Sequence, residues 1–411
     1  MGVWSRLHTA SAVALLPTLA LAPVVAAGLL VLWLALARPL RTAKSRDAAL
    51  VLAAVIAVVA IVHAGEWWLV LATIAVGAAL AAAVVRLDAT VTRAAAVAAG
   101  LGAVGTALGL ALAAFSDASA QGFAQVATAA YHPNATAALA LALVAGSALA
   151  MRGAWIARLA GAIGVGAGLV LLVLTGSRGG LLGVAFAVGI LALLALARLL
   201  ALAKRPLAGA VLAAGGSLVM LVGLQALLMA PDRLAPWLPQ VWSQGVEAVE
   251  STGRTTGADL PLVERLRLLE DPLGTSGGRL GAWKLAREMI ATRPTLGFGF
   301  GAVQRVYAPG AASELANPLT HPHHGILTML LEGGALLAVA VLVLLGGFAW
   351  RLLRAAVHGD AVAGIVAAAF LGLVAMELLD SVLRVGAVGG VALVALVMGA
   401  GTATGDVRTS T

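Results

Sequence analysis

The chain has 411 residues, of which 62% are apolar and only 11% are charged. Soluble domains are nearer half apolar and a quarter charged, so this composition excludes a water-facing globule. The net charge of +8 reflects basic cytoplasmic loops and contacts with anionic lipids, and no nucleic-acid partner is expected. Cysteine is absent, which excludes disulfides, thiol nucleophiles and thiolate metal sites.

Apolar runs of about 20 residues recur along most of the chain, and each is long enough to cross the core of a bilayer. Inside a bilayer the backbone must satisfy its own hydrogen bonds, so a spanning segment is a helix or part of a closed barrel. The runs do not alternate as barrel strands do. The sequence therefore predicts an all-α, polytopic integral membrane protein.

The first apolar stretch, over residues 10–37, is too long for one upright helix and contains Pro17 and Pro23. It predicts one kinked helix or a hairpin of two short helices, and its length argues against a cleavable signal peptide. Further spans are expected over residues 48–64, 67–85, 94–114, 135–151, 155–174, 180–198, 207–229, 325–349, 361–379 and 385–402.

Short loops rich in lysine and arginine define the two sides of the membrane, because such loops stay in the cytoplasm. These basic loops are 38–47, 86–93, 152–158, 198–206 and 351–360. Residues 115–134, 175–179 and 231–324 then lie outside. Arg6 favours a cytoplasmic N-terminus, which gives about twelve spans; eleven spans with the N-terminus outside is the alternative.

Three regions follow from this pattern. Residues 1–230 form N-terminal membrane helices, residues 231–324 a large external loop, and residues 325–411 C-terminal membrane helices. The loop region is rich in prolines and in charges of both signs, which predicts a partly helical subdomain in water or at the interface.

The first polar feature on the external side is the sequence TGSRGG, which contains Ser177, Arg178 and Gly179. An arginine at a membrane boundary is costly unless it has a function or reaches lipid headgroups. The glycines open the backbone and let a bulky anion come close, which favours an anion-binding turn. An arginine that only contacts lipid phosphate is the alternative.

The second feature is a helix that Ser276 can cap and that Pro294 ends. Arg279, Trp283 and Arg287 recur at every fourth position and so share one face of this helix. A cationic face with one aromatic residue suits an anionic or sugar ligand. An amphipathic helix lying on the membrane is the alternative.

The third feature is a cluster of three histidines, His321, His323 and His324, where the external loop meets a span. Histidine exchanges protons near neutral pH, so the cluster indicates a general base. Along the sequence it lacks an acidic or cysteine partner at ligand spacing, so no metal is expected. Glu332 lies two turns further into the span, and a carboxylate there indicates a functional role or a buried partner.

Two further observations bear on the chemistry. Glu377, Asp380 and Arg384 cluster near the last external turn, where they either pair with one another or line a cavity. The chain contains no P-loop and no metal–nucleotide motif, so neither a nucleotide nor another cofactor is expected.

These motifs resemble those of the O-antigen ligase and polymerase superfamily. The family signature is His, an amide or serine, nine residues, and Gly-x-x-Gly. Here it aligns as His323, His324, nine residues and Gly334, with Leu337 in place of the last glycine. The second position is therefore histidine rather than the usual amide.

Two more elements carry the resemblance, in the family's order along the chain. The Ser-Arg-Gly element of a short external turn is matched by Ser177 and the two residues that follow it. The Arg-x-x-x-Trp helix before Pro-x-x-Gly-x-Gly is matched by Arg279 to Trp283 and by Pro294 to Gly299.

The resemblance implies an O-antigen ligase. Such an enzyme moves polysaccharide from undecaprenyl pyrophosphate to a sugar hydroxyl of lipid A–core, in lipopolysaccharide biosynthesis. It would be a multi-pass protein of the bacterial inner membrane, with residues 231–324 and the active site in the periplasm. The expected partners are this donor, this acceptor and membrane lipids.

The family's chemistry assigns roles to the motif residues. Arg178 and Arg279 would clamp the pyrophosphate, with Arg265 and Arg287 as second choices, since guanidinium binds phosphate in a bidentate fork. His323 or His324 would take the proton of the attacking hydroxyl in one inverting displacement. Ser177, Trp283 and Glu332 would support the site.

Three other functions compete with this interpretation. An O-antigen polymerase shares the donor, and a protein O-oligosaccharyltransferase shares the chemistry. A transporter or lipid flippase belongs to a different class, and it predicts functional charges near the bilayer midplane. The notable charges of this chain instead gather on the external side.

Overall fold

The computed structural model describes residues 89–120, 133–229, 276–299, 301–309 and 321–382. Near the C-terminus it also describes residues 392, 395–396 and 398–402. The regular elements in these ranges are all helical, as the sequence predicts. The spans expected before residue 89, and most of the loop expected over 231–324, lie outside the described ranges.

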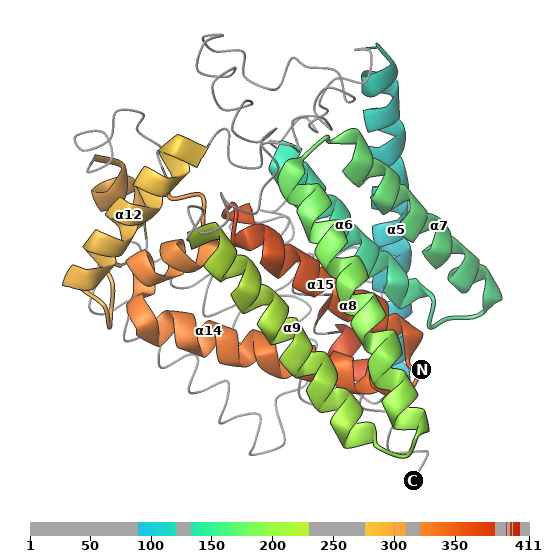
Figure 1. Cartoon of the computed structure of the whole chain (residues 1–411). Coiled ribbons are helices and arrows are strands. Elements are labelled where there is room, and N and C mark those ends of the chain that lie inside the picture. The colour runs from blue at the N-terminus through green and yellow to red at the C-terminus, as the bar shows by residue number, and fades with distance from the viewer. Residues whose placement is uncertain are drawn as a thin grey trace, which may run out of the picture.

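The elements follow one another in the order shown in Figure 1. They are α5 (Ala89–Ala120), α6 (Pro133–Ala150), α7 (Trp155–Leu174), α8 (Arg178–Leu202), α9 (Pro206–Met229), α12 (Ser276–Thr292), the π-helix η5 (Val303–Tyr307), α14 (Gly325–Val357) and α15 (Ala361–Glu377). These bounds agree with the spans predicted between residues 94 and 229 and between 325 and 379.

Six of the described helices are long and apolar enough to cross a membrane. They are Ala96–Ser116, Pro133–Ala150, Trp155–Leu174, Gly179–Leu202, Pro206–Leu224 and Gly325–Val357. Helix α15 is equally apolar but has only 17 residues. The protein is therefore a multi-pass membrane protein, and the predicted total of about twelve spans depends on residues beyond the described ranges.

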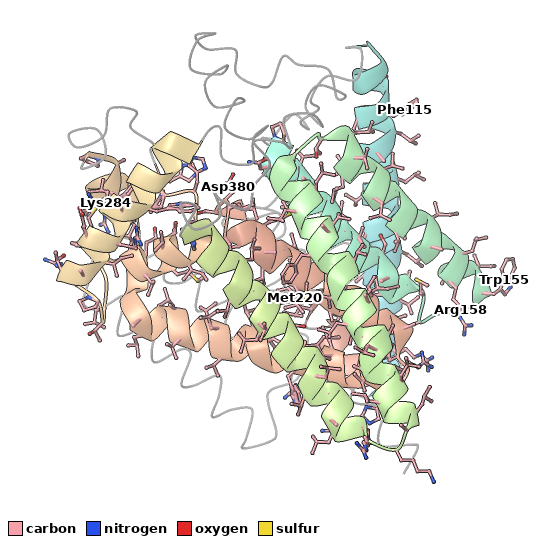
Figure 2. The ribbon with its side chains drawn as sticks, in the orientation of Figure 1. Phe115, Trp155, Arg158, Met220, Lys284 and Asp380 are labelled. Carbon is pink, nitrogen blue, oxygen red and sulfur yellow. The ribbon has the colours of Figure 1, made fainter. Side chains whose placement is uncertain are left out.

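Helix α6 is the centre of this bundle. Its alanines and leucines are strong helix formers, and almost every residue from Ala135 to Ala150 is buried. It packs against α5, α7, α8 and α15. Helices α7 and α9, in contrast, expose large apolar side chains such as Ile156 and Leu218, as expected of surfaces that face lipid. Trp155 projects from the outer edge of α7 in Figure 2.

Small residues let α8 and α15 approach each other closely. Gly183 and Gly372 face each other across this interface, because a Cβ built on Gly372 would lie 2.5 Å from the carbonyl oxygen of Gly183. Close backbone approach through small residues is the usual way in which membrane helices associate. This contact fixes the end of α15, which Asp380 follows by three residues, relative to the start of α8.

Replacing Gly372 by alanine should therefore destabilise the bundle by about 1–3 kcal/mol through overpacking. Gly215→Ala is the matched control, since a Cβ at residue 215 meets no atom of the described residues within 4 Å. Thermal unfolding of the two variants in detergent would compare them. Equal melting temperatures for Gly372→Ala and wild type would contradict this packing.

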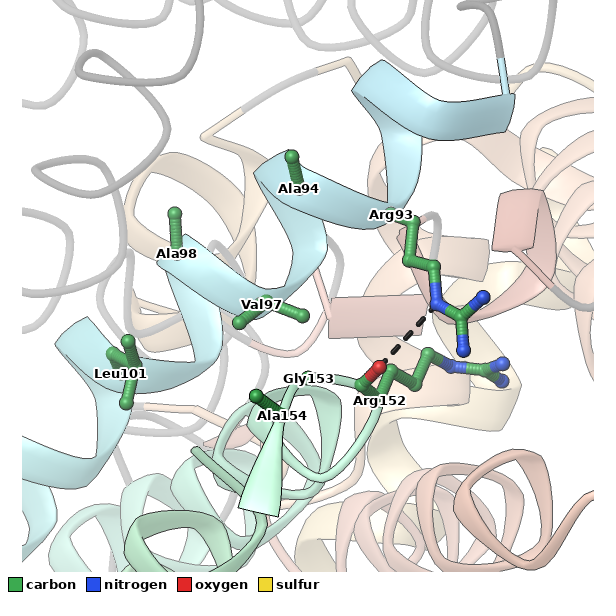
Figure 3. Close-up of a pocket in the computed structure, with 8 residues that line it drawn as sticks. All are labelled: Arg93, Ala94, Val97, Ala98, Leu101, Arg152, Gly153 and Ala154. Carbon is green, nitrogen blue, oxygen red and sulfur yellow. Dashed lines mark hydrogen bonds between the residues drawn. The ribbon is translucent and has the colours of Figure 1, made fainter. Parts of the chain in front are cut away.

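Basic residues gather at the end of the bundle where α6, α8 and α14 finish. They are Arg93, Arg152, Arg158, Arg198, Lys204, Arg205, Arg351 and Arg354. Arg152 forms an ion pair with Asp360 at 2.7 Å. The Nε of Arg93 donates a hydrogen bond to the carbonyl of Arg152. Both arginines line a shallow, largely apolar pocket between α5 and the turn after α6 (Figure 3). This is the end that the positive-inside rule predicts to face the cytoplasm.

Helix α14 is broken at Gly334, where φ is 64° and ψ is −166°. A Cβ at this residue would collide with the backbone of Thr295, so only glycine fits. The amide of Ala335 donates to the Pro294 carbonyl at 2.8 Å, and the amide of Phe298 donates to the Leu331 carbonyl at 2.7 Å. The span predicted as continuous over 325–349 is thus interrupted at Gly334, and the backbone on both sides of this break is hydrogen-bonded to the segment after α12.

Candidate functional site

Four segments that are far apart in sequence meet at the end of the bundle opposite the basic residues. They are the start of α6, the turn before α8, the loop 321–324 before α14, and the residues that follow α15. Helix α12 lies against the first part of α14 on the same side (Figure 1). The site therefore brings together the TGSRGG turn and the histidine cluster, and Trp283 of α12 contacts the histidine loop.

Asp380 lies at the centre of this site. Its Oδ1 is 3.1 Å from Nδ1 of His323 and 3.7 Å from Nε2 of His321. Its Oδ2 accepts a hydrogen bond of 3.0 Å from the amide of Asn134, and the backbone amide of Ser381 donates to Oδ1 at 2.8 Å. Both carboxylate oxygens are thus held in place by groups from three segments.

These neighbours also control the protonation of Asp380. Burial alone would raise the pKa of this carboxyl group, but hydrogen bonds from His321, His323 and Asn134 and the charge of His323 outweigh the burial. Together they hold the pKa of Asp380 well below its ordinary value. The carboxylate is therefore ionised at neutral pH and can only accept hydrogen bonds.

An ionised carboxylate beside Nδ1 fixes the tautomer of neutral His323. The proton lies on Nδ1, facing Asp380, and Nε2 is left with the lone pair that can take a proton. The side chain of His323 is 22% exposed, so it is accessible from water. A histidine held by a carboxylate in this way is chemically able to act as a general base.

His324, the next residue, has a different environment. It is 1% exposed, and its Nδ1 accepts a hydrogen bond from the amide of Leu327, which caps the start of α14. Desolvation by burial lowers the pKa of His324 to about 4, although its backbone hydrogen bond acts in the opposite direction. His324 is thus a buried, neutral helix cap.

Trp283 ties α12 to the histidine loop. Its indole nitrogen donates to the carbonyl of Pro322 at 2.8 Å, and its ring meets that of His324 edge-on at 5.4 Å. Trp283 is 2% exposed and packs with Tyr307. It therefore faces the protein interior, whereas Arg287 on the same helix is exposed and donates to the Trp283 carbonyl.

Ser177 connects the TGSRGG turn to the same cluster. Its hydroxyl donates to the side-chain oxygen of Asn134 at 2.8 Å and accepts from the amide of Gly180 at 3.0 Å, which caps α8. A continuous chain of hydrogen bonds thus runs from Ser177 through Asn134 and Asp380 to His323.

Two of the predicted pyrophosphate arginines, Arg178 and Arg279, are placed only by their backbones. Arg178 is the first residue of α8 and directly follows Ser177, and Arg279 lies in α12 one turn before Trp283. The side chains of both arginines, and the whole of Arg265, lie outside the described part of the structure. The three predicted positions therefore remain predictions.

Glu332 is buried and holds the backbone of the segment after α12. Its carboxylate accepts from the amide of Gly301 at 3.2 Å, and its carbonyl accepts from the amide of Gly299 at 2.8 Å. Glu377 is also buried, and its carboxylate lies directly against Gly325 at the start of α14. Arg384, the third member of the cluster predicted near the last external turn, lies outside the described residues.

Sequence reasoning did not identify two members of this site. Asn134 follows Pro133 at the start of an apolar run, where an amide is an ordinary capping residue and gives no signal of its own. In the sequence Asp380 stands in a charged cluster 57 residues from His323, and nothing there links the two. Their polarity at the external end of predicted spans was the only available indication.

The helices and this site define a polytopic membrane protein with a carboxylate-oriented histidine at one end of its bundle. Residues 163–342 match the family model described as O-antigen ligase. This stretch of the chain is thus similar to the O-antigen ligase and polymerase superfamily, and the similarity supports a ligase or polymerase type of function. The search of curated proteins found no match.

Proposed function

We propose that this protein is an O-antigen ligase of the bacterial inner membrane, with the histidine cluster facing the periplasm. It would transfer O-antigen polysaccharide from undecaprenyl pyrophosphate to a sugar hydroxyl of lipid A–core. The observation that carries this proposal is the contact of 3.1 Å between Nδ1 of His323 and Oδ1 of Asp380. His323 lies within residues 163–342, which match the O-antigen ligase family model.

The acceptor step needs a base, because a sugar hydroxyl is a poor nucleophile. In this proposal the hydroxyl oxygen bonds to the anomeric carbon of the donor while its proton passes to Nε2 of His323. His323 is preferred to His324 because it is accessible and oriented by Asp380, whereas His324 is buried and caps α14.

The donor step releases an anionic leaving group. The bond between the anomeric carbon and the pyrophosphate oxygen breaks, and undecaprenyl pyrophosphate leaves with both electrons. Arg178 and Arg279 would bind this pyrophosphate, with Arg265 and Arg287 as second choices. The first turn of α8 supports this assignment, because helix N-termini attract anions and, within the described residues, a Cβ on Gly179 would meet only the Ser177 hydroxyl, at 3.8 Å.

The displacement is proposed to occur in one step, with inversion at the anomeric carbon and no covalent enzyme intermediate. A base on one side of the reacting carbon and a pyrophosphate site on the other are sufficient for this route. Trapping a glycosyl-enzyme during turnover would contradict it. Apolar grooves between helices would hold the prenyl tail and the acyl chains of the acceptor.

Two related functions use the same kind of site. An O-antigen polymerase would extend another lipid-linked glycan, and a protein O-oligosaccharyltransferase would use a protein hydroxyl as acceptor. A transporter is less well supported, because the described polar cluster lies at one end of the bundle rather than at its middle.

The test is complementation of a ligase-deficient Gram-negative strain with a matched envelope. Wild-type protein should restore polysaccharide attached to lipid A–core on a gel, at a membrane expression level checked by immunoblot. Longer undecaprenyl-linked chains without attachment would instead identify a polymerase. Glycan appearing on protein would identify an oligosaccharyltransferase, and no change in any glycan would point to the transporter.

A further inference from the structure

We propose that His321, His323 and Asp380 form a binding site for a divalent transition-metal ion of the zinc class, and that the bound ion inhibits transfer. The sequence gives the histidines no acidic partner, but the fold brings Asp380 to them from the segment that follows α15. The metal site rests on geometry alone, whereas the inhibition rests on the proposed role of His323 as base.

The spacing of the ligand atoms fits one small ion. One nitrogen from each histidine and one carboxylate oxygen lie within 4.8 Å of one another. The two separations from Oδ1 of Asp380 are 3.1 Å to His323 and 3.7 Å to His321. Two ligands on a tetrahedral zinc ion with bonds of about 2.0 Å are about 3.3 Å apart, so only small side-chain movements are required.

The surroundings of the three residues also suit a metal. Asn134 holds Oδ2 of Asp380 and leaves Oδ1 directed at the two histidines, which is how neighbouring residues orient a ligating carboxylate. The side chains of His321, His323 and Asp380 are 36%, 22% and 17% exposed, so an ion can enter from water. The imidazole rings of His321 and His323 already lie together, with centroids 3.6 Å apart.

The three ligand atoms determine which class of metal ion the site binds. Two imidazole nitrogens and one carboxylate oxygen suit zinc and neighbouring transition metals, whereas magnesium and calcium prefer oxygen ligands throughout. Three protein ligands leave a fourth tetrahedral position for water. We therefore expect zinc to bind and magnesium not to compete with it.

A bound zinc ion would prevent His323 from acting as a base. Coordination of Nδ1 of His323 removes the hydrogen bond to Asp380 and forces the ring proton of neutral His323 onto Nε2. Nε2 then has no lone pair to take the proton of the acceptor hydroxyl. Zinc inhibition is thus a direct consequence of sharing His323 between the two sites.

Isothermal titration calorimetry with zinc chloride tests the site in the full-length chain, purified in detergent without a polyhistidine tag. We expect one zinc ion per chain for wild type and an affinity at least about 10-fold weaker for His321→Ala and His321→Gln. His358→Ala is the matched control, because His358 lies at the other end of α14 and contacts the Arg354 carbonyl. Equal zinc affinity for wild type and both His321 variants would overturn the site.

A transfer assay with and without zinc tests the inhibition separately. Zinc at a concentration that saturates wild type should abolish its transfer, a chelator should restore it, and His321→Ala should keep transferring at that same concentration. Saturating zinc with undiminished wild-type transfer would overturn the inhibition and the base assignment of His323, while the calorimetry would still establish the metal site. Inhibition that is equal in wild type and His321→Ala would show that zinc acts elsewhere.

Discussion

His323→Ala should lower the rate of polysaccharide transfer by about 10²–10⁴-fold, the range that a positioned general base contributes. The acceptor hydroxyl would then lose its proton to water rather than to an oriented imidazole. Binding of the donor should change little, since the proposed pyrophosphate groups are not altered. The loss should therefore be in kcat and not in the KM for the donor.

The matched variant is His324→Asn, at the residue next to it. Asparagine is among the best helix-capping residues, so its side-chain oxygen can replace Nδ1 of His324 in accepting from the amide of Leu327. It also restores the amide that the family signature usually has at this position. We expect His324→Asn to fold and to retain most of its transfer activity.

Single-turnover assays with purified donor and acceptor, in matched detergent micelles, would compare the two variants. Size-exclusion profiles would establish that both are folded. Retained transfer in His323→Ala together with lost transfer in folded His324→Asn would reverse the assignment and make His324 the base.

The membrane helices could be predicted from sequence because their cause is local. An apolar run of sufficient length must form a helix in a bilayer, and Pro133, Asp360 and the Ser177 turn mark where such helices begin. The break at Gly334 could not be predicted in this way. It depends on the Thr295 backbone, which approaches α14 only in the folded protein.

Only the local part of the candidate site can be predicted from the sequence, because contacts between distant segments depend on the fold. His323 stands in a recognisable motif, but its environment is set by Asp380 and Asn134, which arrive from the ends of other helices. The sequence alone could not distinguish His323 from His324, because they are adjacent and chemically identical. Burial against Trp283 is what separates them, and burial is a property of the fold.

Asp380→Asn should lower kcat by roughly 10²-fold or more, while the KM for the acceptor changes little. An amide can turn its NH₂ group toward Nδ1 of His323 and stabilise the tautomer whose proton lies on Nε2, which cannot act as a base. The loss of negative charge also removes the stabilisation of the imidazolium that forms during transfer. Asp380 acts through His323, so it is a positioning residue.

Asp360→Asn is the control for this substitution, because Asp360 is also a partly buried carboxylate with a close partner but lies at the opposite end of the bundle. It should reduce stability through its lost pair with Arg152 and leave kcat largely unchanged. The decisive comparison is between Asp380→Asn alone and Asp380→Asn combined with His323→Ala. If Asp380 works through His323, the kcat of the double variant should be no lower than that of His323→Ala. A further drop in kcat of the same size in the double variant would show that Asp380 acts independently of His323. The oriented-base mechanism would then have to be abandoned.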